Sequence, residues 1–136
     1  MEVDIQYMAS PKLQLYGATT YTYGRNISAS EPMRRIPPLF STIGGYYNLT
    51  DRLQIKLNWK HANAQTRLSR GDKDDNRIPV GGSKAWNFVD FSAHYTQNWY
   101  TIRLGVNNIF DQAYRTHGSG IDGPGRSLWI ALKFNF

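Results

Sequence analysis

The sequence has no cysteine among its 136 residues and only three histidines. Without cysteine the chain has no disulfide scaffold, no thiolate zinc site and no cysteine nucleophile. Long apolar runs are missing too: the longest is the five residues of 128–132, whereas a membrane-spanning helix needs about 20. Glu2 and Asp4 follow Met1 at once, without the apolar segment of a secretory signal peptide. These absences exclude disulfide-rich proteins and helical membrane proteins, and no signal peptide is expected.

Basic residues outnumber acidic ones, 16 Lys and Arg against 10 Asp and Glu, which gives a net charge of +6. An excess of this kind can indicate nucleic-acid or anionic-surface binding. The basic residues are scattered, however, and the cluster between Arg67 and Lys84 is offset by Asp72, Asp74 and Asp75. A solvated loop explains this cluster better than a nucleic-acid site.

Alternation of apolar and polar residues is the main pattern, while helical periodicity is almost absent. Such alternation predicts β-strands with two chemically different faces. In the clearest segment, 53–60, four apolar residues share one face and four polar residues share the other. The segment 39–47 is apolar or small on both faces, so its facing stays open. The seven expected strands cover 3–8, 13–23, 39–47, 53–60, 89–95, 100–106 and 128–136.

The connections between these strands alternate between short and long. Three are short, and three are long: 24–38, 62–85 and 107–127. Outer-membrane barrels have short periplasmic turns and long external loops as a rule. We therefore expect an all-β fold, an antiparallel transmembrane β-barrel segment whose long loops face outside.

The charged and aromatic residues of the strands fit this expectation. A Lys or Arg facing lipid near the bilayer midplane costs about 2–4 kcal/mol, and every charged strand residue lies opposite the apolar face. Aromatic residues lie near both strand ends, as two interfacial girdles require; those near the long loops are Tyr21, Tyr23, Trp86 and Phe88. A soluble half-buried sheet sorts charge in the same way. The alternative is therefore a soluble β-barrel or OB-like module that binds nucleic acid.

Seven strands do not close a bacterial barrel, because single-chain outer-membrane barrels have an even strand number. The alternation that is typical of a strand also begins at Val3, without a preceding turn. We expect the chain to be part of a larger barrel.

The last third of the sequence contains a specific run of motifs. Gly105-Val106-Asn107-Asn108-Ile109-Phe110-Asp111 is followed by Tyr114-Arg115, a Gly-rich loop, Gly125-Arg126 and a final strand that ends in Phe136. This run resembles the C-terminal end of TonB-dependent outer-membrane receptors. Two further stretches fit the resemblance, 21–38 and 76–79, so it spans essentially all of 1–136.

The resemblance implies one domain, residues 1–136, forming the C-terminal part of a barrel of 22 strands in the bacterial outer membrane. The plug and the signal peptide are not in this chain. The implied function is energy-dependent import of a ferric siderophore, haem or cobalamin. The implied partners are outer-membrane lipid, the barrel-assembly machinery, and TonB through the missing plug only. No enzyme activity, no resident cofactor and no nucleic-acid partner are expected, and the sequence does not identify the ligand.

Several residues are candidates for sites. Arg34, Arg35, Arg115 and His117 lie in expected external loops, where they could contact an anionic ligand or haem. The apolar, aromatic end formed by Leu132, Phe134 and Phe136 is a candidate signal that the assembly machinery reads by strand addition.

Two weaker motifs concern metal binding and catalysis. Asp72, Asp74 and Asn76 have the spacing that begins a calcium loop, but Arg77 stands where glycine is needed. Ser119, His117 and Asp122 are hydrolase residue types, yet Gly118-Ser119-Gly120 is not a nucleophile elbow. The sequence therefore predicts no metal site beyond this weak calcium candidate, and no catalytic residues.

Overall fold

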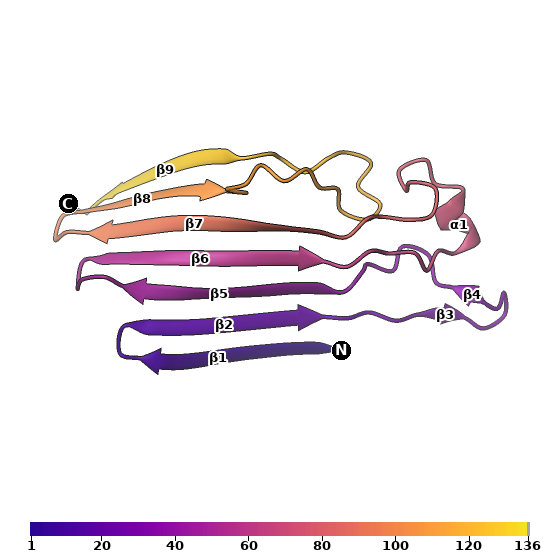
Figure 1. Cartoon of the computed structure of the whole chain (residues 1–136), viewed down its shortest axis with the longest axis horizontal. Coiled ribbons are helices and arrows are strands. Elements are labelled where there is room, and N and C mark those ends of the chain that lie inside the picture. Colours follow the sequence, from indigo (N-terminus) through magenta and orange to yellow (C-terminus); the bar gives the residue numbers. More distant parts are fainter. Residues whose placement is uncertain (136) are drawn as a thin grey trace.

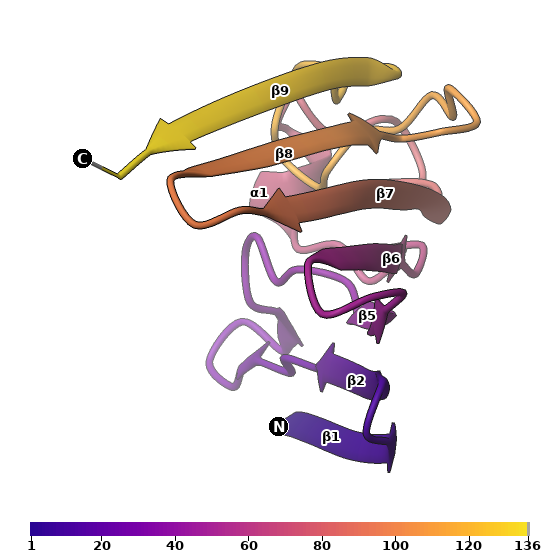
Figure 2. The same cartoon turned by 90° about the vertical axis from the view of Figure 1, so that its left-hand side faces the viewer.

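The computed structural model describes residues 1–135 as one antiparallel sheet of seven strands, ordered as they follow in the chain. Figures 1 and 2 show a single twisted layer with no second sheet over either face. The seven strands confirm the seven expected from alternation. They are β1 (Glu2–Ser10), β2 (Leu13–Thr20), β5 (Phe40–Asn48), β6 (Leu53–Ala62), β7 (Trp86–Thr96), β8 (Tyr100–Asn107) and β9 (Ser127–Phe134).

The three long connections lie together at one end of the sheet and the three short turns at the other (Figure 1). We name the long ones loop A (21–39), loop B (63–85) and loop C (108–126). Loop A contains a small hairpin of β3 (Arg25–Asn26) and β4 (Glu31–Pro32), and loop B contains the one-turn helix α1 (Arg70–Lys73). The chain runs from the loop end at its N-terminus to the turn end at its C-terminus (Figure 1).

The strand register gives the sheet one apolar and one polar face. Across the sheet, Leu15 pairs with Gly45, Gly45 with Leu57, and Leu57 with Phe91. Since directly paired residues point to the same side, this row is apolar. The register also settles the facing of 39–47, because Ile43 pairs with Trp59 and therefore lies on the apolar face.

The apolar face is not covered by any other part of the described chain. Leu57 is 54% exposed, Leu104 45% and Ile130 69%. A soluble protein of this size buries such a face, whereas the wall of a transmembrane barrel presents it to lipid. The soluble OB-like alternative is therefore not favoured. No helix in residues 1–135 is both long and apolar enough to span a membrane.

Strand β7 begins at Trp86 rather than at residue 89, and two further details differ from the expectation. Strand β2 ends at Thr20 rather than Tyr23. Beyond it Tyr21 still exchanges two 2.9 Å backbone hydrogen bonds with Met1, but β5 offers no ladder partner beyond Phe40. The second difference concerns the aromatic girdle. Trp86 and Phe88 pair with Ala62 and Lys60, which places them on the polar face and not toward lipid.

The polar face carries rings that lie flat against the backbone. A Cβ added at Gly44 would clash with the Tyr16 ring, and one at Gly105 would clash with the Trp129 ring. Both rings are fixed by hydrogen bonds along the face: the Tyr16 hydroxyl reaches Asn58 at 2.7 Å. Further along, Lys60 forms a 3.0 Å ion pair with Asp90. The side chains of the polar face are thus bonded to one another, and the rings among them lie close to the sheet.

Candidate functional site

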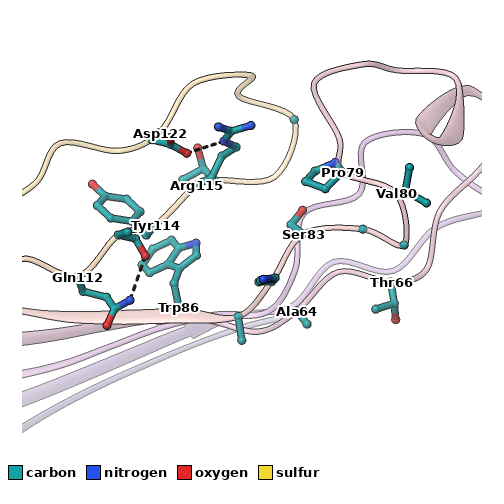
Figure 3. Close-up of a pocket in the computed structure, with 17 residues that line it drawn as sticks. Ala64, Thr66, Pro79, Val80, Ser83, Trp86, Gln112, Tyr114, Arg115 and Asp122 are labelled. Carbon is teal, nitrogen blue, oxygen red and sulfur yellow. Dashed lines mark hydrogen bonds and ion pairs between the residues drawn. The ribbon is translucent and has the colours of Figure 1, made fainter.

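A cavity of about 690 Å³ lies between loops B and C at the start of β7 (Figure 3). Its size falls in the range of about 300–1,000 Å³ that is typical of small-molecule sites. It is lined by Ala64 and Thr66, by residues 79–86 and 112–116, and by Gly118 and Asp122. The cavity is therefore built by the long loops on the rim of the sheet.

Trp86 and Tyr114 form one wall of this cavity and belong to a cluster of tilted aromatic rings. The Trp86 and Tyr114 ring centroids are 4.9 Å apart, and Tyr114 lies 4.7 Å from Phe88. Phe40 packs against Trp86 from β5 at 6.0 Å. Since Trp86 and Phe88 belong to β7 and Tyr114 to loop C, the cluster fixes the base of loop C on the sheet.

Arg115 and Asp122 supply opposite charges to the cavity. The Arg115 Nε donates to Asp122 Oδ1 at 2.7 Å (Figure 3). This hydrogen bond is the main cause that raises the pKa of Arg115 and lowers the pKa of Asp122. Lys84, also in the lining, forms no ion pair with any described residue. The lining thus has two cationic side chains and one carboxylate.

His117 lies beside the cavity and does not line it. Its Nδ1 is hydrogen-bonded to the Ser83 hydroxyl, which links loop C to loop B. Its Nε2 is buried without a hydrogen-bond partner among the described residues. Burial lowers the pKa of His117 below its ordinary value, against the opposing effect of the Asp72 and Asp75 carboxylates. The imidazole is therefore neutral at pH 7 and connects two loops.

Arg34 and Arg35 do not reach the cavity but hold loop A to loop B. Both guanidinium groups contact the carboxylate of Asp75, at 3.3 Å and 2.9 Å, and Arg77 contacts the same carboxylate at 2.8 Å. The Asp75 side chain is only 4% exposed. Sequence analysis missed this role, because about 40 residues separate Asp75 from the two arginines of loop A.

The residues at 72–76 whose spacing resembles the start of a calcium loop do not form a cation site. Asp72 closes a capping box with Ser69 at the start of α1, and its Oδ1 accepts from the Arg35 backbone N–H. Burial alone would raise the pKa of Asp72, but these backbone hydrogen bonds outweigh it and lower the pKa. Asp74 and Asn76 are exposed. Within residues 1–135 no group of three metal-ligating side chains of the His, Cys, Asp and Glu types comes together, so the calcium candidate has no structural support.

Further contacts join loops A and B. The Arg67 guanidinium donates to the Gly24 carbonyl at 2.7 Å and lies 3.9 Å from the centre of the Tyr23 ring. The Gln65 side chain donates to the Ile36 carbonyl at 2.8 Å. Loops A and B are therefore joined along most of their length.

Asn108 organises the start of loop C. It is 2% exposed and has a φ of 52°, a conformation that asparagine tolerates better than most residues. Its side chain accepts from the Gln112 N–H and donates to the carbonyls of Gln112 and Pro124. Asp111 then accepts from the Arg126 N–H at 2.7 Å. The Asn107–Asp111 motif thus closes loop C on itself between β8 and β9.

The remaining sequence candidates are placed as follows. Leu132 and Phe134 lie on the apolar face of β9, where Phe134 packs against Trp99, and Phe136 lies outside the described residues. The hydrolase residue types do not assemble, because the Ser119 hydroxyl donates to the Ile121 carbonyl while His117 and Asp122 bind elsewhere.

Comparisons with known proteins agree with this architecture. An iron-regulated outer membrane virulence protein of Vibrio cholerae is 24% identical over 99% of the chain, which spans 21% of that protein. The structure of the copper transporter OprC superimposes with a TM-score of 0.88 at 21% identity, covering 99% of this chain and 23% of OprC.

The siderophore receptor PirA from Acinetobacter baumannii superimposes with a TM-score of 0.77 at 19% identity, over 99% of this chain and 21% of PirA. The chain thus spans about a fifth of the length of these proteins.

A family comparison covers most of the chain. Residues 1–109 match the family described as TonB dependent receptor-like, beta-barrel. The match includes the first six strands of the sheet and loops A and B. The chain therefore belongs to the TonB-dependent receptor-like β-barrel family, whose members are receptors and transporters of the bacterial outer membrane.

Proposed function

We propose that this chain is the C-terminal barrel part of a receptor that imports a scarce ligand of the ferric-siderophore, haem or cobalamin class. In this proposal TonB acts through a plug that is not in this chain. The observation that carries the proposal is the cavity between loops B and C, with its aromatic wall and two cationic side chains at the loop end of a lipid-facing sheet.

Iron is the cargo that the relatives favour. The Vibrio relative is named as iron-regulated, and PirA is named a siderophore receptor. OprC is named a copper transporter. The cavity of this chain has no imidazole, thiol or thioether in its lining, and one carboxylate. Such a donor set suits an organic chelate better than a bare copper ion.

Each part of the chain has a role in this proposal. The apolar face contacts outer-membrane lipid, and the polar face lines the interior of a barrel that further strands complete. Loops A, B and C face outside, and loops B and C supply the ligand contacts of the cavity. The end of β9, with Leu132 and Phe134, offers the barrel-assembly machinery an apolar strand to recognise.

Transport rather than catalysis is the proposed activity. The three residue types that could form a hydrolytic triad, Ser119, His117 and Asp122, are each hydrogen-bonded to groups outside that set.

The test uses a full-length receptor that carries this segment, expressed in an outer-membrane uptake strain that lacks its own receptors. Labelled ferric catecholate and hydroxamate siderophores, haem and cobalamin are supplied one at a time, with and without TonB. We expect TonB-dependent uptake of one of them. A receptor that is inserted in the outer membrane and takes up none of the four would overturn the proposal.

A further inference from the structure

Arg115 is held in the cavity by a single contact that leaves most of its hydrogen-bonding capacity unused. Only its Nε donates to Asp122, and no described residue accepts from its two terminal nitrogens. A guanidinium group has five N–H donors in a planar fork, which matches a carboxylate or phosphate with two parallel hydrogen bonds. The fork of Arg115 therefore remains open to an anionic group from outside the chain.

Asp122 competes only weakly with an external anion for the guanidinium group of Arg115. Its side chain is 70% exposed and lies seven residues from Arg115 on the same loop. Ion pairs so exposed to water are held loosely, because water and salt screen the attraction. An anion that enters the cavity can therefore take the place of Asp122 without breaking any contact between loops.

The rest of the lining indicates what else the ligand contains. Lys84 adds a second positive charge that no described carboxylate neutralises. Trp86 and Tyr114 present an aromatic wall beside Arg115 (Figure 3), and flat rings pack well on such walls. A cavity of about 690 Å³ holds considerably more than a simple inorganic anion.

We propose that this cavity binds an organic anion built on a flat ring, and that the anionic group displaces Asp122 from Arg115. Trp86 and Tyr114 hold the ring, Arg115 and Lys84 hold the charge, and Asp122 occupies the place of the anion when the cavity is empty. This proposal deepens the proposed import function and rests on it for the access of ligand from outside. Binding itself needs no transport.

Substitutions of Arg115 and of Asp122 should change the affinity for the anion in opposite directions. Arg115→Gln removes the anion anchor, so binding of a ring-bearing anion should weaken about tenfold, as for the loss of one charge-assisted hydrogen bond. Asp122→Asn removes the competing carboxylate, so the same anion should bind several-fold more tightly. A purely structural role of the pair predicts that both substitutions weaken binding.

The test measures binding to the purified full-length receptor in detergent by saturation-transfer NMR. The probes are salicylate, which has a ring and a carboxylate, phenol, which has the ring alone, and acetate, which has the charge alone. We expect salicylate to bind best. The matched control is Arg25→Gln in loop A, an exposed arginine that forms no ion pair with any described residue and does not line the cavity. It should leave salicylate binding unchanged.

Two outcomes overturn the site: salicylate binding no better than phenol, or Asp122→Asn weakening salicylate binding as much as Arg115→Gln. The uptake assay is independent of this one. Probe binding with the expected pattern but no uptake of any cargo refutes the import function and leaves the site in place. Uptake without probe binding refutes the site alone.

Discussion

Asp75 is a nearly buried carboxylate that gathers guanidinium groups from two loops. Its Oδ2 lies within 3.3 Å of Arg34, Arg35 and Arg77, and its Oδ1 also accepts from the Arg77 N–H. Neutralising a buried charge that several partners share leaves those partners without compensation. Asp75 is therefore the residue on which the attachment of loop A to loop B depends most.

The substitution Asp75→Asn should loosen loops A and B without unfolding the sheet. We expect a loss of about 1–3 kcal/mol in local loop stability, because hydrogen bonds to a charged group are lost. Limited proteolysis in the loops should become clearly faster. Asp74→Asn is the control, since Asp74 is exposed and forms no ion pair in residues 1–135. Equal cleavage rates in the two variants would contradict the role of Asp75.

Loop A is attached to loop B by more contacts than loop C is. Loop A is joined to loop B by the Asp75 cluster, by Arg67 and by Gln65. Loop C is joined to loop B by the hydrogen bond between His117 and Ser83. Loops A and B should therefore move as one body, and loop C is the element that can swing away and open the cavity.

Acid should favour that opening. The pKa of His117 is lowered by burial, so the closed form binds a proton less readily than the open form. Above the ordinary histidine pKa of about 6.5 both forms are neutral and closure carries no penalty. As pH falls below that value and through the lowered pKa, protonation increasingly favours the open loop.

Spin labels at Val80 and Ile121, both exposed tips of loops B and C, measure this movement in the full-length receptor. Their separation should increase or broaden between pH 7.5 and pH 5, while labels at Ile27 and Val80 should stay at a constant distance. A distance between Val80 and Ile121 that does not change with pH would show that His117 does not govern loop C. His117→Gln should abolish the pH response.

The two faces of the strands allow a matched test in β1. Ile5 and Gln6 are neighbours and both are exposed, Ile5 on the apolar face and Gln6 on the polar face. Ile5→Arg should lower barrel stability in lipid by about 2–4 kcal/mol, since an arginine near the midplane of the lipid face is costly. Gln6→Arg should fold almost normally. Urea unfolding in vesicles measures both, and equal losses would contradict the assignment of the faces.

Alternation in the sequence was sufficient to locate the seven strands and the two ends of the sheet. It failed at Trp86 and Phe88, because the expected strand began at residue 89 whereas β7 begins at Trp86, so that both rings share the face of Asp90. The hairpin at 25–32 and helix α1 are too short to show any periodicity.

The candidate site could be predicted only in part. Arg115 was identified from a motif, and the structure places it in the cavity. Trp86, Lys84 and Asp122 were not assigned to a ligand site, because Asp122 of loop C lies 36 residues or more beyond Trp86 of β7 and Lys84 of loop B. The apparent calcium ligands share the same limitation: residue type suggested a metal, while the Asp72 carboxylate is taken by Ser69 and by the backbone N–H of the distant Arg35.

At the scale of the whole molecule the sheet ends in two edge strands, β1 and β9. Edge strands present backbone groups that lipid does not hydrogen-bond, so membrane sheets close into barrels. The chain produced alone should therefore associate into oligomers in detergent, whereas a full-length receptor should be monomeric. Size-exclusion chromatography with light scattering distinguishes the two. A chain that is monomeric and soluble without detergent would refute the membrane assignment.

The flat rings of Tyr16 and Trp129 affect what can pass along the inside of such a barrel. Each ring occupies the space that the side chain of Gly44 or Gly105 would otherwise fill, and so takes up little of the bore. Replacing either glycine by alanine would force a ring upright into the passage. Gly44 and Gly105 thus help to set the free width inside the barrel of the proposed receptor.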